Sequence, residues 1–242
     1  MNVVAIIQAR QGSTRLPGKV MMKVLGKPLL EYLIDRVKRA QLLKKIVVAT
    51  TVLKEDDLIA EFCEAYSIPC YRGAVEDVLG RYLGVAQQFS ADVIVRLTGD
   101  CPLLDPEVID KVVASYFRQY PKVDYVANTL IRTYPRGLDV EVFSFESLKI
   151  ADREAKSTSD REHVTAFIYK HPEQFILSSV TGEEDKSRFR WTVDTEDDFR
   201  LIETLIKAIY PHNPNFTLDD LLSLVQCHPE WQQINSHIQQ KQ

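Results

Sequence analysis

The segment from Arg10 to Lys19 carries three cationic side chains and two glycines within ten residues. Glycine lets a backbone fold closely around an anion, and amides exposed in this way form an anion-binding nest. The guanidinium of Arg15 can bind a phosphate through two parallel hydrogen bonds, whereas Lys19 acts as a point charge. The segment contains neither GxxxxGK[ST] nor GxGxxG, the signatures of P-loops and dinucleotide sites. It predicts a phosphate-binding loop of another kind, and the alternative is a solvated basic loop.

Two aspartates follow predicted strands and are candidates for metal binding. Asp100 comes after an apolar run and Asp194 after Trp-Thr-Val. Carboxylates so placed can hold Mg²⁺, which prefers one or two of them together with phosphate oxygens and water. Asp100 could instead cap the helix that begins near Pro106, but Asp105 is better placed for that role. For Asp194 the local sequence leaves metal binding and a plain helix N-cap open.

Six polar residues of the second half are candidates for binding a second substrate. An arginine among them can bind a carboxylate bidentately. Asp139 and Glu141 lie two apart in a predicted strand, so they would face the same side and could bind hydroxyl groups. His163 is expected to donate or accept hydrogen bonds rather than act as a base. For each residue a surface ion pair or an exposed helix position is the alternative. The set is Arg136, Asp139, Glu141, Arg161, His163 and Arg190.

Strand and helix patterns alternate through the first 120 residues, which is typical of βαβ units. Strands are expected at 3–9, 46–50, 70–72 and 92–97, and helices at 28–40, 55–66, 75–89 and 106–118. Such alternation predicts a parallel sheet with helices on both faces. Ligands bind these sheets at the carboxyl ends of the strands. The loops at 10–19 and 98–105 would therefore share the ligand edge.

The second half is less regular. Strands are expected at 124–128, 138–143, 175–180 and 190–193. Helices are expected at 159–169 and 195–209, followed by two short helices within 218–238 that Pro229 separates. The segment from Ser159 to Glu162 fits a capping box, which would begin the first of these helices.

The charge, apolar content and cysteine content of the chain limit the kinds of macromolecule or surface that it can bind. The chain has 30 basic and 34 acidic residues, for a net charge of −4, which argues against non-specific nucleic-acid binding. No apolar stretch approaches the roughly 18 residues of a membrane span, and the first residues do not resemble a signal peptide. The four cysteines show no zinc spacing. We therefore expect a cytoplasmic protein with reduced thiols and neither a nucleic-acid nor a membrane partner.

The chain resembles the cytidylyltransferases that make CMP-Kdo and CMP-sialic acids, whose acceptors are 2-keto-3-deoxy sugar acids. Three motifs carry the resemblance in order, namely QARQGSTRLPGK, RLTGDCPLLDP and WTVDTEDDF. Two further segments, TYPRGLDVEVF and DREHVTAFIY, are similar to the branch named for spore coat polysaccharide biosynthesis protein F. The similar segments extend from Val3 to about Arg200.

The resemblance implies a nucleotide-diphosphosugar-transferase-like α/β fold, with three α/β/α layers and a mainly parallel central sheet. It implies that loop cations bind the CTP phosphates and that Asp100 and Asp194 hold Mg²⁺ at the reacting phosphate. The catalytic set would be Arg10, Arg15, Lys19 and Asp100. The nucleotide-binding set would be Ala9, Arg10, Gly12, Ser13, Arg15, Lys19, Arg72, Arg81 and Thr98. Arg72 or Arg81 could instead pair with Glu76 or Asp77.

The expected reaction transfers CMP from CTP to a sugar acid, giving a CMP-sugar and pyrophosphate for surface polysaccharide synthesis. One alternative is a metal-dependent glycosyltransferase of the same fold, although that class usually has Asp-x-Asp where this chain has Thr98-Gly99-Asp100. Another is a non-catalytic nucleotide- or sugar-sensing module. The family implies a homodimer. We expect one domain, residues 1–242, with the dimer interface and the acceptor-binding region at about 130–180.

Overall fold

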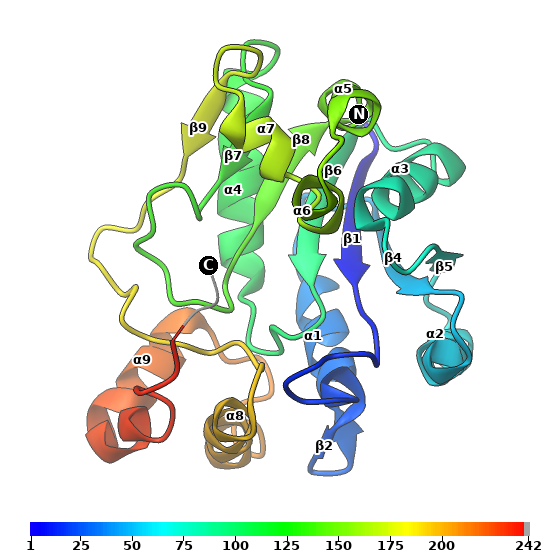
Figure 1. Ribbon diagram of the computed structural model, residues 1–242. Helices are drawn as coiled ribbons and strands as arrows, with labels where there is room; N and C mark the ends of the chain where they lie inside the picture. Colours follow the sequence, from blue (N-terminus) through cyan, green and yellow to red (C-terminus); the bar gives the residue numbers. More distant parts are fainter. Residues whose placement is uncertain (240–242) are drawn as a thin grey trace.

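The computed structural model describes residues 1–239, which contain a seven-stranded sheet in the order β5-β4-β1-β6-β8-β7-β9 (Figure 1). Four parallel strands form one half, namely β1 (Val3–Gln8), β4 (Lys45–Thr51), β5 (Cys70–Gly73) and β6 (Val93–Thr98). The other half is β7 (Tyr125–Ala127), β8 (Glu141–Ser144) and β9 (Leu177–Ser179). Only β8 runs against its neighbours within this sheet. The sheet is therefore mainly parallel, as predicted.

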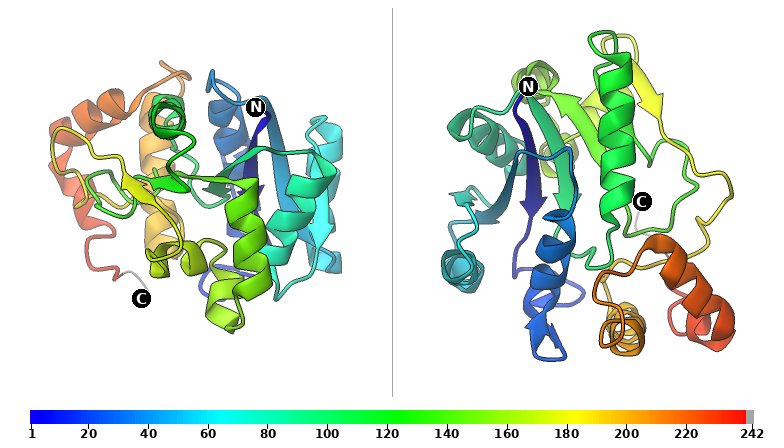
Figure 2. Two further views of the ribbon diagram at one scale, coloured as in Figure 1. Left: turned by 90° about the horizontal axis from the view of Figure 1, so that it is seen from above. Right: turned by 180° about the vertical axis from the view of Figure 1, so that it is seen from behind.

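Helices cover both faces of the sheet and complete three layers (Figure 2). The hydrophobic core on one face is shared by α1 (Leu29–Val37), α2 (Asp57–Ala65), α4 (Pro106–Gln119), α8 (Glu196–Ile209) and α9 (Leu218–Cys227). The other packs on α3 (Val78–Gln88), α5 (Phe145–Glu154) and α7 (Ala166–Lys170). Along β1, Val3 and Ala5 enter the first core and Val4 enters the second, because successive strand side chains point to opposite faces. The predicted fold class is confirmed.

The first half follows the predicted elements, with ends that differ by a few residues. A small hairpin of β2 (Lys23–Val24) and β3 (Lys27–Pro28) was not predicted. The short 3₁₀ turn η1 (Lys19–Met21) precedes this hairpin, and a second one, η2 (Lys54–Asp56), precedes α2. Asp105 caps α4 by accepting a hydrogen bond from the backbone N–H of Glu107, as expected. Asp100 is thus left free of a capping role.

The prediction of one helix over 159–169 is wrong. The chain forms α6 (Thr158–Glu162) and α7, and Ser157 rather than Ser159 is the N-cap of α6. Between the helices, the Thr165 N–H donates to the His163 carbonyl at 2.6 Å, and Val164 has a φ of 58°. This is a tight three-residue turn, and positive φ is rare for a β-branched residue. The helix ends because the backbone reverses there.

The prediction of a strand at 190–193 is also wrong, since the segment makes a single bridge between Arg190 and Arg136. Gly137, at φ 100°, turns the neighbouring segment away after that bridge. The strand predicted at 138–143 begins only at Glu141. Before Glu141, the Asn128 side chain takes the place of strand-to-strand hydrogen bonds: it donates to the Leu138 carbonyl and accepts from the Val140 N–H. The sequence-based pairing of Asp139 with Glu141 on one strand face therefore fails.

The second half of the chain contains the helices predicted after residue 194 and one helix, α5, that was not predicted. Residues 145–154 form the unpredicted α5, whose N-cap Ser144 accepts from the Ser147 N–H. Thr195, not Asp194, is the N-cap of α8, where it forms a capping box with Asp198. Helix α9 and the turn η3 (Pro229–Gln233) are separated at Pro229, as predicted. Within residues 1–239, no helix is long and apolar enough to cross a membrane.

Candidate active site

A pocket of about 320 Å³ opens at the carboxyl ends of β1 and β6. The two strands pair in parallel, with Gln8 opposite Thr98, so the segments that follow them leave the sheet side by side. The Gly99 N–H donates to the Gln8 carbonyl at 2.8 Å. A Cβ at Gly99 would lie 2.9 Å from that carbonyl oxygen, so glycine is what allows the two segments to meet. The pocket therefore lies at the edge expected for ligands in such sheets.

The loop between β1 and η1 folds back on itself and forms one wall of the pocket. The N–H groups of Ser13 and Gly18 both donate to the Gln11 carbonyl, at 2.8 and 2.9 Å. The Gln11 N–H donates to the buried Asp56 carboxylate at 2.6 Å. Gly18 has a φ of 73°, a left-handed conformation that glycine adopts without strain. The loop is thus anchored at Gln11 and presents its cationic side chains to the pocket.

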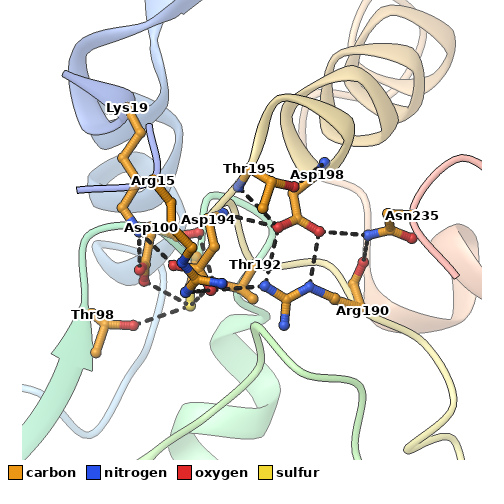
Figure 3. Close-up of polar contacts among 11 residues, drawn as sticks. Arg15, Lys19, Thr98, Asp100, Arg190, Thr192, Asp194, Thr195, Asp198 and Asn235 are labelled. Atoms are coloured by element: carbon orange, nitrogen blue, oxygen red, sulfur yellow. Dashed lines mark hydrogen bonds and ion pairs between the residues drawn. The ribbon is translucent and has the colours of Figure 1, made fainter. Parts of the chain in front are cut away.

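Asp100 and Asp194 converge on the ammonium group of Lys19, as Figure 3 shows. The Lys19 Nζ lies 2.6 Å from Asp100 Oδ2 and 2.9 Å from Asp194 Oδ1. Arg15 and Arg190 also bind the second oxygen of Asp194, at 3.0 and 2.7 Å. The two aspartates therefore share one cation, and Asp194 alone has three cationic neighbours.

The pKa values follow from this arrangement. Burial by itself lowers the pKa of the Lys19 ammonium, but Asp100 and Asp194 outweigh burial and raise it above its ordinary value. Burial by itself raises the pKa of Asp194, but Lys19, Arg190 and Arg15 outweigh burial and lower it. Both groups are therefore held in their charged forms.

Backbone hydrogen bonds hold Asp194 close to Asp100, although the two aspartates are far apart in the sequence. The Val193 N–H donates to the Asp100 carbonyl at 2.9 Å. Upstream, the Trp191 N–H donates to the Arg136 carbonyl at 2.7 Å. A Cβ at Gly137 would lie 2.5 Å from the carbonyl carbon of Trp191, so the two backbones meet only because residue 137 is glycine. This contact fixes the segment that carries Asp194.

The fully buried Asp198 holds Arg190, which in turn binds Asp194. Asp198 accepts from Arg190 Nε at 2.8 Å, from Asn235 at 2.8 Å, and from the backbone N–H of Asp194 at 3.0 Å. Burial alone would raise the pKa of Asp198, but Arg190 and Asn235 lower it overall. Arg190 is thereby positioned as a bridge between Asp198 and Asp194 (Figure 3).

The opposite end of the pocket is built around Arg96, Glu162 and His163. Arg96 forms an ion pair with the buried Glu141, whose other oxygen accepts from Tyr125 at 3.0 Å and from the Thr165 hydroxyl. Arg96 Nε is buried and has no hydrogen-bond partner in the described part of the chain. Burial alone would lower the pKa of Arg96, but Glu141 outweighs burial and raises it above its ordinary value. Arg96 is therefore a cation that Glu141 holds in place on the pocket lining.

Arg81, from the first turn of α3, is a second cation of this pocket with donors that have no partner in the described residues. It is 4% exposed, and neither Nε nor Nη1 has a partner among residues 1–239. A Cβ at Gly73 would lie 2.8 Å from Arg81 Cγ, so the stem of Arg81 packs directly on the glycine backbone. Burial lowers the pKa of Arg81 below its ordinary value. An unpaired buried cation is costly, which points to an anionic or carbonyl-bearing ligand here.

The pocket brings together most of the predicted nucleotide and metal residues. Those on its lining are Ala9, Arg10, Ser13, Arg15, Lys19, Arg81, Thr98, Asp100 and Asp194. Gly12 lies just outside it, against the Glu55 side chain. Arg72 also lies outside, bound to Asp57 at 2.7 Å and to the Thr51 carbonyl at 2.9 Å. Among the described residues, neither Arg72 nor Arg81 forms an ion pair with Glu76 or Asp77.

Only one of the predicted acceptor residues, His163, lines this pocket. Asp139 is bound to Arg132, Arg161 to Asp77 and Asp152, and Glu141 to Arg96. Arg136 and Arg190 line a separate pocket of about 330 Å³ near η3. The pocket-lining residues that sequence analysis missed include Arg96, Glu162 and Gln8. Arg96 lies in RLTGDCPLLDP, so its position in a quoted motif was the available signal.

The donor set suits Mg²⁺. Two carboxylates already converge on one cation, and no group of three His, Cys, Asp or Glu forms a metal cluster within residues 1–239. Mg²⁺ uses one or two carboxylates and completes its shell with water and phosphate oxygens, so a third protein ligand is not needed. Asp100 and Asp194 would hold it.

Comparison with known proteins agrees with this geometry. The family model for cytidylyltransferases matches residues 4–219. The chain is 32% identical to the spore coat polysaccharide biosynthesis protein SpsF of Bacillus subtilis, covering 95% of this chain and 96% of that protein. It is 35% identical to 3-deoxy-manno-octulosonate cytidylyltransferase of Geobacter metallireducens over 47% of this chain and 44% of that enzyme.

A solved structure of a cytidylyltransferase from Leptospira borgpetersenii serovar Hardjo-bovis superposes with a TM-score of 0.92. The two chains are 30% identical, and the match covers 100% of each. The family model covers most of the chain, including both strand ends that form the pocket and the segment that carries Asp194. The chain therefore belongs to the cytidylyltransferase family, and it is a nucleotidyltransferase.

Proposed function

We propose that the protein transfers CMP from CTP to an acidic sugar, releasing pyrophosphate. The observation that carries the proposal is the convergence of the loop cations with Asp100 and Asp194 in one pocket. Five cations line that pocket against three carboxylates in the described residues, so it suits a polyanion. SpsF and the octulosonate enzyme are the relatives that suggest a surface polysaccharide role and a sugar acid.

The nucleotide would enter between the loop and α3. Arg10, Arg15 and Lys19 would bind the phosphates, since they are the cations of the loop wall. Arg81 lies on the α3 side of the pocket and has two donors that are unpaired in the described residues. It would therefore bind the nucleoside. Thr98 would contact the nucleotide near the metal-binding aspartate. Holding the phosphates in line with the attacking hydroxyl accounts for most of the catalysis in this class of reaction.

Asp100 and Asp194 would hold the Mg²⁺ of the reaction. The ion would supply positive charge at the α-phosphate and acidify the sugar hydroxyl. Arg15 and Lys19 would stabilise the pyrophosphate as it leaves. Arg190, fixed by Asp198, would keep Asp194 in its ionised form and in place. No separate general base is assigned.

The acceptor would bind at the end of the pocket formed by Arg96, Glu162 and His163. Arg96 is the cation that lines this end of the pocket and is held in place by Glu141, so it is the residue best placed to bind a sugar carboxylate. His163 and Glu162 would bind hydroxyl groups. This assignment replaces the acceptor set expected from sequence with residues that line the same pocket as the proposed nucleotide site.

The test is pyrophosphate release from each of the four NTPs with Mg²⁺ and a panel of sugars. The panel contains 3-deoxy-manno-octulosonate, a sialic acid and neutral hexoses. We expect release with CTP and one or more of the acidic sugars. Absence of release with every pair would refute the proposal, and sugar transfer from a nucleotide-sugar donor would instead support the glycosyltransferase alternative. The homodimer and the cytoplasmic location stay predictions, which size-exclusion chromatography with light scattering and cell fractionation would check.

A further inference from the structure

The place where Asp100 and Asp194 converge is filled by the chain's own cation. Lys19 Nζ lies within 2.9 Å of both carboxylates, and the lysine is 8% exposed. A divalent ion bound by the same two oxygens would need the volume that this ammonium occupies. Lys19 and a metal are therefore competitors for one position.

The charges around that position balance without a metal. Lys19, Arg15 and Arg190 face Asp100, Asp194 and Asp198 within one connected network of ion pairs. Adding a dication while Lys19 stays in place would leave an excess of two positive charges. The excess would lie in a pocket whose lining also contains Arg10, Arg81 and Arg96. Coulomb repulsion at separations of a few ångströms in a partly buried site makes this unfavourable.

A bound triphosphate removes this obstacle. It brings several negative charges to the loop wall, where Arg15 and Lys19 are the cations nearest the two aspartates. The lysine ammonium is a point charge on a flexible four-carbon stem, so it can turn from the carboxylates to a phosphate oxygen with little backbone change. Gly18, in its left-handed conformation, directly precedes Lys19 and starts the short turn η1.

We propose that Lys19 is a tethered counterion that keeps the Asp100–Asp194 pair closed to divalent metal until a nucleoside triphosphate binds. The inference rests on the proposed function, because it takes the two aspartates as the metal-binding pair. It assigns Lys19 a second role besides phosphate binding, which is to set the order in which nucleotide and metal enter. In the nucleotide-free protein the lysine holds both carboxylates. In the nucleotide complex it serves the phosphates.

The test measures Mn²⁺ binding to the nucleotide-free protein by electron paramagnetic resonance of the unbound ion. Mn²⁺ shares the preference of Mg²⁺ for oxygen ligands. We expect wild type to bind weakly and Lys19→Met to bind about 10- to 100-fold more tightly, because a unit charge leaves the site. The double variant Lys19→Met/Asp100→Asn should return to weak binding. Lys27→Met is the matched control, since Lys27 pairs with Glu31 and Asp35 away from the pocket, and it should behave as wild type.

Two results would overturn the inference. The first is a folded Lys19→Met protein, judged by circular dichroism, that binds Mn²⁺ no more tightly than wild type. The second needs no lysine variant: wild type that binds Mn²⁺ more tightly than Asp100→Asn does would show that the pair is already open. Neither experiment contains nucleotide or sugar. Failure of the pyrophosphate assay would therefore refute the proposed function separately, and failure of Mn²⁺ binding to improve would refute only the role of Lys19.

Discussion

The two ends of the pocket are built in different ways. The loop end contains Lys19, Asp100 and Asp194, and the α6 end contains Arg96, Glu162 and His163. At the loop end, cations and carboxylates neutralise one another, and Lys19 links Asp100 to Asp194. At the α6 end, Arg96 is held from behind by Glu141 and keeps a buried donor without a partner in the described residues. The loop end is thus satisfied before a ligand binds and must rearrange. The α6 end is preorganised, because Glu141 already holds Arg96 in place.

This contrast predicts the largest effect at the loop end. Asp100→Asn should lower kcat/KM for pyrophosphate release by about 10³-fold, or ~4 kcal/mol, because it removes charge that acts on the transition state. The thermal midpoint should change little, since Lys19 is the one ion-pair partner of Asp100 in the described residues. Steady-state kinetics and calorimetry check the two parts. Turnover that survives the substitution would contradict the metal assignment.

A second prediction concerns the preorganised end. Arg96→Met should lower the free energy of unfolding by about 3 kcal/mol, because it leaves Glu141 buried without its cation. It should also raise KM for the sugar about tenfold while KM for CTP stays near the wild-type value. Chemical denaturation and initial-rate kinetics measure these quantities.

The double variant Arg96→Met/Glu141→Gln is the control for this pair. It removes the buried charge and should recover most of the stability, but not the sugar KM. If the sugar KM recovers together with the stability, Arg96 has only a structural role. The distinction between the two ends of the pocket would then be lost.

Arg81 provides a third prediction, with opposite signs for stability and binding. Arg81→Met should stabilise the nucleotide-free protein by about 1 kcal/mol, because it removes a buried cation whose donors are unpaired. The same change should raise KM for CTP about tenfold, through loss of those donors to the nucleotide. Thermal unfolding without ligand and the CTP dependence of the rate are the measurements. A loss of stability would show that Arg81 is satisfied before nucleotide binds.

The smallest effect is expected at Arg161, which sequence analysis assigned to the acceptor. Its ion pairs with Asp77 and Asp152 are partly exposed, so Arg161→Met should cost at most about 1 kcal/mol of stability and leave both KM values unchanged. Burial alone would raise the pKa of Asp77, but Arg161 and the Gly80 N–H lower it below its ordinary value of 3.8.

The sign of the pH dependence follows from that shift. A carboxylate with a lowered folded-state pKa stabilises fully above its unfolded value, and this contribution is lost as pH falls through the folded value. The stability difference between wild type and Arg161→Met should therefore be constant near neutral pH and shrink below about pH 4. Unfolding measured across that range checks it, and a difference that grows on acidification would be inconsistent with the ion pair.

Local sequence was sufficient for the loop end and insufficient for the α6 end. The three loop cations lie within ten residues of one another, and Asp100 and Asp194 each follow an apolar segment, so their types and spacing could be recognised. The role of Arg96 depends on Glu141, 45 residues away, and that of Arg161 on Asp77, 84 residues away. Such partners are set by strand order and helix packing, which periodicity does not give.

The incorrect strands have the same origin. The local pattern of residues 190–193 indicates a strand, but a strand also requires a neighbouring segment that continues to pair with it along its length. Gly137 turns the neighbouring segment away after one bridge, because its backbone is left-handed. The break in the predicted helix at Val164 depends equally on tertiary contacts, since Thr165 directs its hydroxyl to Glu141 across the pocket wall.

The excess of cations on the pocket lining has a kinetic consequence. The chain carries a net charge of −4, yet five cations and three carboxylates line the pocket in the described residues. A positive opening in a negative molecule focuses the electric field, which raises the local concentration of anions and speeds their diffusional encounter. The association rate for CTP should therefore fall as ionic strength rises, while non-specific adsorption of polyanions elsewhere on the surface stays weak. The charge distribution thus favours small anions in two ways, by directing them to the pocket and by binding them there.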